Sequence, residues 1–314
     1  MNIDRRTVLI TAGYGLAASL TPLRLALAAA DIKTLRLIDP LSKPSMAWTA
    51  LDLVRPAVKR NLGCEVVAQT IPGHDGFDAI HAVMEASGDE TRVLGTGVMA
   101  TQYAATLMKT DVRLEDLMPI AKLTNGFSMT LFAKRGGTLT TWADVVAATA
   151  PLKLSSLQRQ TATYIAVLMA QRKGALSAEA VMRDTLGEVM DDVTAGRSAI
   201  GIANTNTVAK HLDELLPIVS FGAQRNMMLS GTPTFAEVTG NPKLAFTESI
   251  GVFASPKLAP DIAARLTQAF LAAGNDVDVL GMAEAGNIPL AVSGPEVLAE
   301  TMKRNEDVLA RVLG

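Results

Sequence analysis

Short apolar segments alternate with longer amphipathic segments along most of the chain. The apolar runs predict strands, and the segment after each has the spacing of a helix with one buried face. The first three pairs are strands at 34–39, 65–70 and 92–96 and helices at 49–61, 77–86 and 101–108. Strands that alternate with helices in this way indicate βαβ units and a parallel sheet.

The same pattern continues through the rest of the chain. Further strands are predicted at 117–124, 129–135, 152–156, 198–204, 216–222 and 246–255, with a helix at 161–173. Thr141 and Asp144 have the spacing of a helix capping box. Two C-terminal helices start at Pro260 and Pro295, which suit the first turn of a helix. No linker rich in proline or glycine divides the chain, so any two domains are joined through ordinary strands.

Composition agrees with an α/β fold and narrows the function. The 314 residues are 49% hydrophobic but only 4% aromatic, which favours helices packed on sheets, and the length suits about two domains of ~100–200 residues each. The formal net charge of −2 and the absence of a basic stripe argue against a nucleic-acid partner. Cys64 is the single cysteine, so no disulfide is expected. No histidine or cysteine spacing suggests a metal site.

Residues 1–30 have the three-part pattern of a secretory signal peptide. Arg5 and Arg6 precede an apolar stretch that ends in the small residues 26–30, and the adjacent arginines suggest the twin-arginine export route. An uncut membrane anchor is the alternative, but Arg24 interrupts the apolar run, which is short for a span. We therefore expect cleavage near Ala28 or Ala30 and a periplasmic protein.

The segment 92–104 contains a glycine turn that resembles a cofactor site. Gly95-x-Gly97-x-x-Ala100 matches the turn that wraps a dinucleotide pyrophosphate. Its context argues against that function, because two βα units precede it and the next strand ends in Thr124 rather than in an acidic residue. We predict no cofactor and interpret the turn as part of a ligand cleft.

The loop 71–76 offers a second alternative, a catalytic dyad of His74 and Asp75. Neighbours on a loop seldom face each other, and no G-x-S-x-G nucleophile motif is present. The turns before the predicted helices are instead rich in small and hydroxyl residues. They would gather at the carboxyl ends of parallel strands, where free N–H groups of helix starts can bind a carboxylate. These turns are 42–45, 73–76, 96–97 and 155–163.

Several stretches in order resemble one family of binding proteins. They include LRLIDPLSKPSMAWTALDLVRPAVKRNLGCEVVAQTIPGHDG, DVRLEDLMPIAKLT, GAQRNMMLSGTPTFAEVTG and ESIGVFASPKLAPDIAARL. Together they are similar to the solute-binding proteins of tripartite tricarboxylate transporters, the Bug or TctC-like family. The resemblance implies a two-lobed periplasmic binding protein of the type II, Venus-flytrap class. Each lobe would hold a mostly parallel sheet, with lobe 1 at 31–127 plus 248–314, lobe 2 at 128–247 and a two-strand hinge between them.

The resemblance also implies a small organic carboxylate ligand, a permease partner of the tripartite tricarboxylate type, and a monomer. The chain departs from the family pattern where the ligand binds: Trp48 replaces an aspartate that meets amino groups in some members, and Gln158 and Gln160 replace two glycines. The full set of predicted ligand-binding residues is Ser42, Pro44, Ser45, Trp48, Gly73, His74, Asp75, Gly76, Thr96, Gly97, Ser156, Gln158, Gln160, Thr161 and Asn204.

The sequence therefore predicts a binding protein without catalytic or metal-ligating residues. Two other functions stay open at this point. One is a sensory or scaffold subunit that partners a membrane protein, and the other is an exported hydrolase that uses His74 and a serine from a facing loop.

Overall fold

The computed structural model describes residues 32–41, 45–86 and 90–314. The predicted signal peptide at 1–30 lies outside the described residues, as do Ser42 and Pro44. No helix of the described part is long and apolar enough to cross a membrane.

The first sheet of the described chain has six strands in the order β11-β4-β10-β3-β1-β2. Their bounds are β1 Thr34–Asp39, β2 Glu65–Thr70, β3 Glu90–Gly97, β4 Met118–Thr124, β10 Ile250–Ala254 and β11 Leu290–Ser293. β1 is parallel to β2 and β3, whereas β10 is antiparallel to both β3 and β4. β4 therefore points the same way as β1, β2 and β3.

The second sheet has five strands in the order β7-β6-β8-β5-β9 within the same described residues. They are β5 Met129–Lys134, β6 Leu152–Leu157, β7 Ala178–Arg183, β8 Ile200–Asn204 and β9 Leu215–Ser220. Only β5 runs against its neighbours, being antiparallel to β8 and β9. The predicted α/β architecture is confirmed. Both sheets are mixed, but in each of them most strands share one direction.

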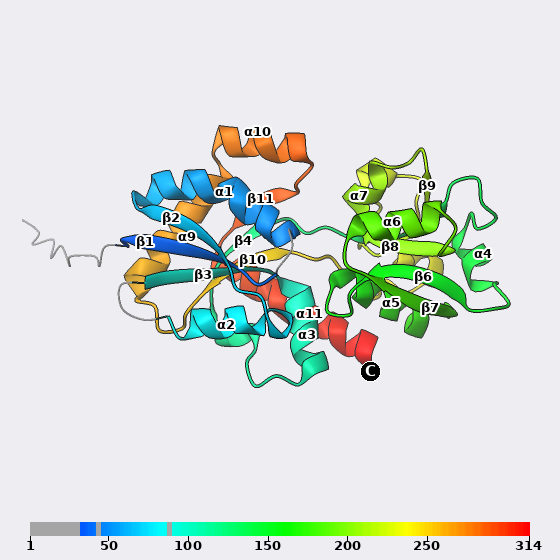
Figure 1. Cartoon of the computed structure of the whole chain (residues 1–314), viewed down its shortest axis with the longest axis horizontal. Coiled ribbons are helices and arrows are strands. Elements are labelled where there is room, and N and C mark those ends of the chain that lie inside the picture. The colour runs from blue at the N-terminus through cyan, green and yellow to red at the C-terminus, as the bar shows by residue number, and fades with distance from the viewer. Residues whose placement is uncertain (1–31, 42–44, 87–89) are drawn as a thin grey trace, which may run out of the picture. The chain divides into compact units, whose positions relative to one another are not determined.

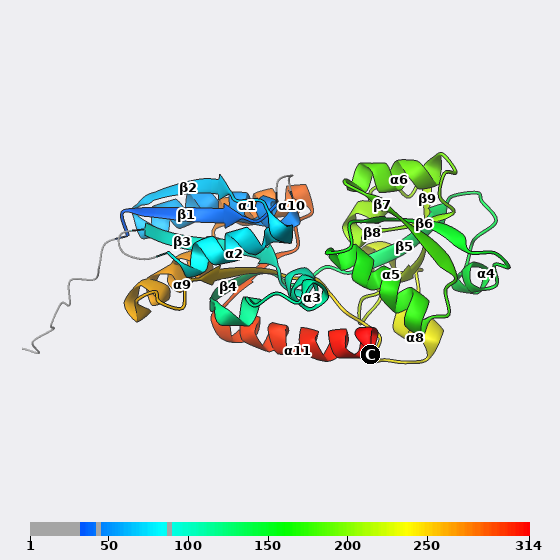
Figure 2. The same cartoon turned by 60° about the horizontal axis from the view of Figure 1, so that its bottom comes forward.

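Helices cover both faces of each sheet (Figure 2). On the first sheet α1 packs against α9 and α10, and α3 packs against α11 on the other side. The bounds there are α1 Met46–Leu62, α2 Phe77–Met84, α3 Val98–Met108, α9 Pro260–Gly274, α10 Val277–Gly286 and α11 Pro295–Leu313. The second sheet carries α4 Trp142–Val146, α5 Ala162–Lys173, α6 Leu186–Thr194, α7 Thr205–Ala209 and α8 Phe235–Thr239.

Local sequence signals explain where many of these helices begin. Ser45 caps α1 by accepting a hydrogen bond from the Trp48 N–H at 3.0 Å. The predicted capping box at α4 is present, since Thr141 and Asp144 each accept a hydrogen bond from the other's backbone N–H. Pro260 and Pro295 lie in the first turns of α9 and α11, as predicted.

Several elements were not predicted from the sequence, among them β7, β11, α6, α8 and α10. β7 and β11 are edge strands whose residues are mostly half-buried, so neither has the buried apolar run that identifies a strand. The predicted strand 246–255 is also too long, because β10 starts only at Ile250 and the residues before it belong to the crossing between the sheets.

The two chain segments that cross between the sheets pair with each other. The N–H of Phe127 donates to the carbonyl of Glu248 at 2.8 Å, and the N–H of Glu248 donates back at 2.9 Å. Next to this pair Gly126 has φ +93°, and a Cβ there would lie 2.8 Å from Thr247 Oγ1. This pairing forms the predicted two-strand hinge. All strands of the first sheet fall within 31–127 and 248–314, and those of the second within 128–247; the lobe boundaries themselves stay a prediction.

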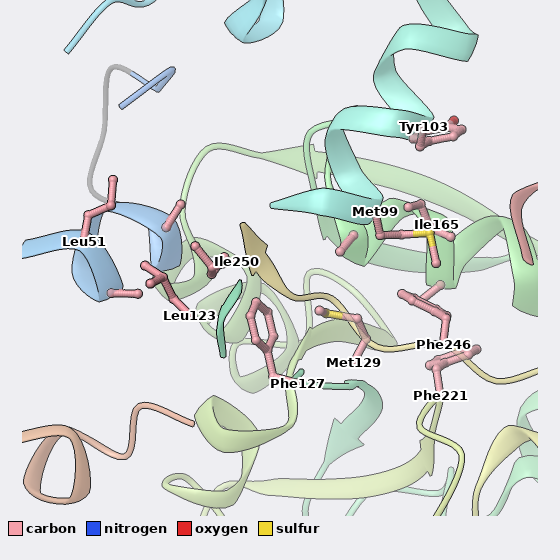
Figure 3. Close-up of a cluster of buried hydrophobic side chains, with 14 of the residues drawn as sticks. Leu51, Met99, Tyr103, Leu123, Phe127, Met129, Ile165, Phe221, Phe246 and Ile250 are labelled. Carbon is pink, nitrogen blue, oxygen red and sulfur yellow. The ribbon is translucent and has the colours of Figure 1, made fainter. Parts of the chain in front are cut away.

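One buried apolar cluster runs through the hinge. Figure 3 shows Phe127 and Phe246 of the two crossings together with Met129 of β5 and Ile250 of β10. Ile165 of α5 and Met99 of α3 belong to the same cluster. Each lobe therefore contributes apolar side chains to the hinge as well as to its own interior.

Candidate ligand-binding site

A cavity of about 710 Å³ is lined by residues of both sheets and their helices. From the first sheet come the turn after β1, the start of α1 and the start of α3. The second sheet contributes the turn after β6, the start of α5 and the end of β8, and the crossing segments contribute Phe127 and Glu248. A more open groove of about 920 Å³ beside β9 and α4 contains none of the predicted site residues.

The structure brings more than half of the predicted ligand-binding residues to this cavity. Those that line it are Ser45, Gly76, Thr96, Gly97, Gln158, Gln160, Thr161 and Asn204. They come from five separate turns and strand ends, so their convergence follows from the fold and not from closeness in sequence.

Other predicted residues lie away from the cavity wall. Trp48 is half-buried on α1, and Gly73 lies in an exposed turn. Ser156 is buried behind the wall, where its Oγ donates to Thr163 Oγ1 at 3.3 Å. The His74 side chain is 78% exposed, and its Nδ1 lies 2.8 Å from Asp78 Oδ1. Asp75 belongs to the short 3-10 turn 74–76, and its side chain lies outside the described part.

The start of α5 presents hydroxyl and N–H groups to the cavity. Thr161 is the N-cap residue, but its Oγ1 donates to the Gln158 carbonyl at 2.7 Å and caps no N–H of the helix. That Oγ1 also lies 2.7 Å from Thr163 Oγ1. The Tyr164 N–H is bound to the Thr161 carbonyl at 3.1 Å, so the N–H groups left at the positive end of the helix dipole are those of Ala162 and Thr163, two residues that line the cavity.

The start of α3 is already occupied by a carboxylate of the chain itself. Glu248 is 3% exposed, and its Oε1 accepts from the Met99 N–H at 3.0 Å and from the Ser249 N–H at 2.8 Å. Its Oε2 accepts from the Ala100 N–H at 2.9 Å. Burial raises the pKa of Glu248 to about 7, although the backbone N–H donors act in the opposite direction.

This arrangement explains the glycine turn that resembles a cofactor motif. A Cβ on Gly95 would lie 2.1 Å from Leu51 Cδ1, and a Cβ on Gly97 would lie 3.1 Å from Glu248 Oε2. The glycines therefore allow helix packing and the approach of Glu248. The position of Glu248 also explains why α3 starts at Val98 rather than at the predicted Thr101. The group that caps α3 is the Glu248 carboxylate, which is about 150 positions away along the chain.

The described residues of the cavity wall include acidic side chains but no basic ones. Asp184 and Glu248 line it, and its described lining residues include no lysine, arginine or histidine. Asp184 Oδ1 accepts from Gln158 Nε2 at 2.9 Å, which orients that amide. Among the described residues no group of three or more histidine, cysteine, aspartate or glutamate side chains could hold a metal ion. The polar groups that the described wall offers are therefore hydroxyl, amide, carboxylate and backbone groups.

Sequence reasoning missed Glu248, Thr163 and Asp184 as residues of this wall. Glu248 left a detectable signal, because it is an acidic residue inside a predicted buried strand. A carboxylate in such a position needs internal hydrogen-bond donors. The donors themselves belong to α3 and could not be identified without the fold.

Solved structures with the same architecture were found by structural comparison. A TctC solute-binding protein from Polaromonas superposes with a TM-score of 0.72 at 16% identity, covering 89% of this chain and 97% of that one. MatC from Rhodopseudomonas palustris with bound malate superposes with a TM-score of 0.71 at 20% identity, covering 88% of this chain and 98% of that one. The chain has the fold of the TctC-type solute-binding proteins. The R. palustris protein Rpa4515 with adipate superposes with a TM-score of 0.69 at 18% identity, covering 89% of this chain and 97% of that one.

The two-lobed fold expected from the sequence resemblance is thus confirmed, and these structural neighbours are binding proteins. No protein-family model matches the chain. No curated protein sequence matches it either.

Proposed function

We propose that this chain is a periplasmic solute-binding protein that captures a small carboxylate-bearing metabolite between its lobes. It would deliver the ligand to a membrane permease of the tripartite tricarboxylate type. The observation that carries the proposal is the cavity between the two sheets, at which the uncapped start of α5 and hydroxyl groups of both lobes converge. The malate and adipate bound by two structural neighbours support the same ligand class.

A carboxylate suits this wall although its described residues include no basic side chain. A buried carboxylate must be hydrogen-bonded, and helix N-terminal N–H groups with nearby hydroxyls provide such bonds. The start of α5 offers both, from its first turn and from Thr161 and Thr163. Gln158, Gln160 and Asn204 would then select among ligands through their amides. Contacts to both lobes would stabilise a closed hinge.

The remaining features of the proposal come from the sequence. The segment 1–30 would direct export to the periplasm and be removed near Ala28 or Ala30. The mature protein would be a monomer. An exported hydrolase is not favoured, because His74 is exposed and does not line the cavity.

A thermal-shift screen of mono-, di- and tricarboxylates against the purified protein tests the ligand class. At a ligand concentration of 100 Kd we expect stabilisation of about 2.7 kcal/mol and a clear rise in Tm. Uncharged amides and esters of the same acids serve as controls and should give no shift. A screen in which no carboxylate raises Tm would contradict the proposal.

A further inference from the structure

The starts of α3 and α5 both line the cavity, but they differ in what their N–H groups bind. Thr96, Gly97, Ala100 and Thr101 of the α3 start line the cavity, as Thr161 does at the α5 start. At α3 the N–H groups of Met99 and Ala100 are already bound to Glu248. The chain therefore supplies its own anion to the α3 start.

Glu248 is held in this position from several directions. Its backbone is fixed in the hinge by the paired hydrogen bonds with Phe127. Its side chain is held by the N–H groups of Met99, Ala100 and Ser249. Gly97 provides the space for Oε2, since a Cβ there would come within 3.1 Å of it. A ligand group that needed the α3 start would have to displace this carboxylate from three hydrogen bonds.

We propose that Glu248 is a specificity-determining residue that restricts the cavity to ligands with a single carboxylate. This inference rests on the proposed function and names its ligand class more narrowly. A monocarboxylate uses the free donors at α5 and places its uncharged part against the apolar wall, which includes Ile80, Leu94 and Phe127. A dicarboxylate brings a second anion into a wall that holds Glu248 and Asp184, lacks a basic side chain among its described residues, and has no free helix start at α3.

The test compares acids that differ by one carboxylate only. Hexanoate and adipate have the same six-carbon chain, and benzoate and terephthalate form a second, aromatic pair. Calorimetric titration at pH 8 keeps Glu248 mainly ionised, because its pKa is about 7. For the wild-type protein we expect the monocarboxylate of the better-binding pair to have a Kd at least tenfold lower than that of its dicarboxylate.

Two variants test whether Glu248 causes this preference for monocarboxylates. Glu248→Ala frees the N–H groups of α3, and Glu248→Gln keeps the size of the side chain but removes its charge. In both we expect the ratio of the two Kd values to fall below threefold, chiefly through tighter dicarboxylate binding. Glu248→Gln retains hydrogen-bond acceptor capacity, so it provides the test if Glu248→Ala does not fold.

The outcomes separate this inference from the proposed function. Equal affinity of the wild-type protein for both members of a pair would overturn the role of Glu248 and leave carboxylate binding intact. An unchanged preference in the variants would overturn it as well. If no carboxylate of either pair or of the wider screen binds, the proposed function fails, and this inference fails with it.

Discussion

Thr161→Asp is expected to weaken binding of a monocarboxylate at least a hundredfold without destabilising the protein. Aspartate is a favoured N-cap residue, and Asp276 already caps α10 by accepting from the N–H groups of Asp278 and Val279. At α5 the new carboxylate would satisfy the first-turn N–H groups that the ligand needs, as Glu248 does at α3. It would also repel the ligand, since two like charges 4 Å apart interact by about 4 kcal/mol at an effective dielectric constant of 20.

The matched control is Thr161→Asn, which has nearly the same shape and also caps helices but carries no charge. We expect it to weaken binding less than tenfold. Calorimetric titration gives both affinities, and thermal unfolding verifies that neither variant has a lower Tm. Similar affinities for the two variants would show that the acidic group of the ligand does not dock at α5.

Replacing Glu248 by Gln is expected to change how stability depends on pH. In the folded protein burial raises the pKa of Glu248 from 4.5 to about 7. Between pH 4.5 and pH 7 the Glu248 carboxyl is ionised in the unfolded chain but still protonated in the folded protein. The contribution of this group to stability is therefore fully present below pH 4.5 and is lost as the pH rises to 7. This difference in the pKa of Glu248 between the folded and unfolded states corresponds to about 3 kcal/mol of unfolding free energy.

The measurement is urea unfolding of the wild-type protein and Glu248→Gln in buffers from pH 4.5 to 8. The difference in unfolding free energy between them should shift in favour of the variant by about 3 kcal/mol over this range. Taking the difference removes the contribution of other groups, such as the buried Asp39, whose pKa burial raises to about 6. Parallel curves for the two proteins would mean that Glu248 is ionised at all these pH values.

Much of the fold could be predicted because its signals are local. The strands β1, β2, β4 and β5 are short apolar runs, and helix starts such as Ser45 and Pro260 carry their own capping chemistry. β7 and β11 were missed because they lie at sheet edges and are stabilised by their neighbours more than by their own composition.

The candidate site was predictable only where it consists of turn residues. Thr96, Gly97 and Thr161 follow predicted strands, and the carboxyl ends of strands with a common direction meet at one edge of a sheet. Glu248 could not be placed there, because its partners Met99 and Ala100 are about 150 residues away in sequence. The glycine turn lines the cavity, but the anion that its helix binds belongs to the chain.

A crystal structure with the tightest-binding monocarboxylate from the screen would show directly whether a ligand carboxylate binds at the start of α5. We expect the ligand between the two sheets, with its carboxylate oxygens about 3 Å from the first-turn N–H groups of α5 or from Thr161 Oγ1. Glu248 should still be bound to Met99 and Ala100. A ligand outside this cavity, or one whose carboxylate has displaced Glu248 from α3, would contradict this expectation.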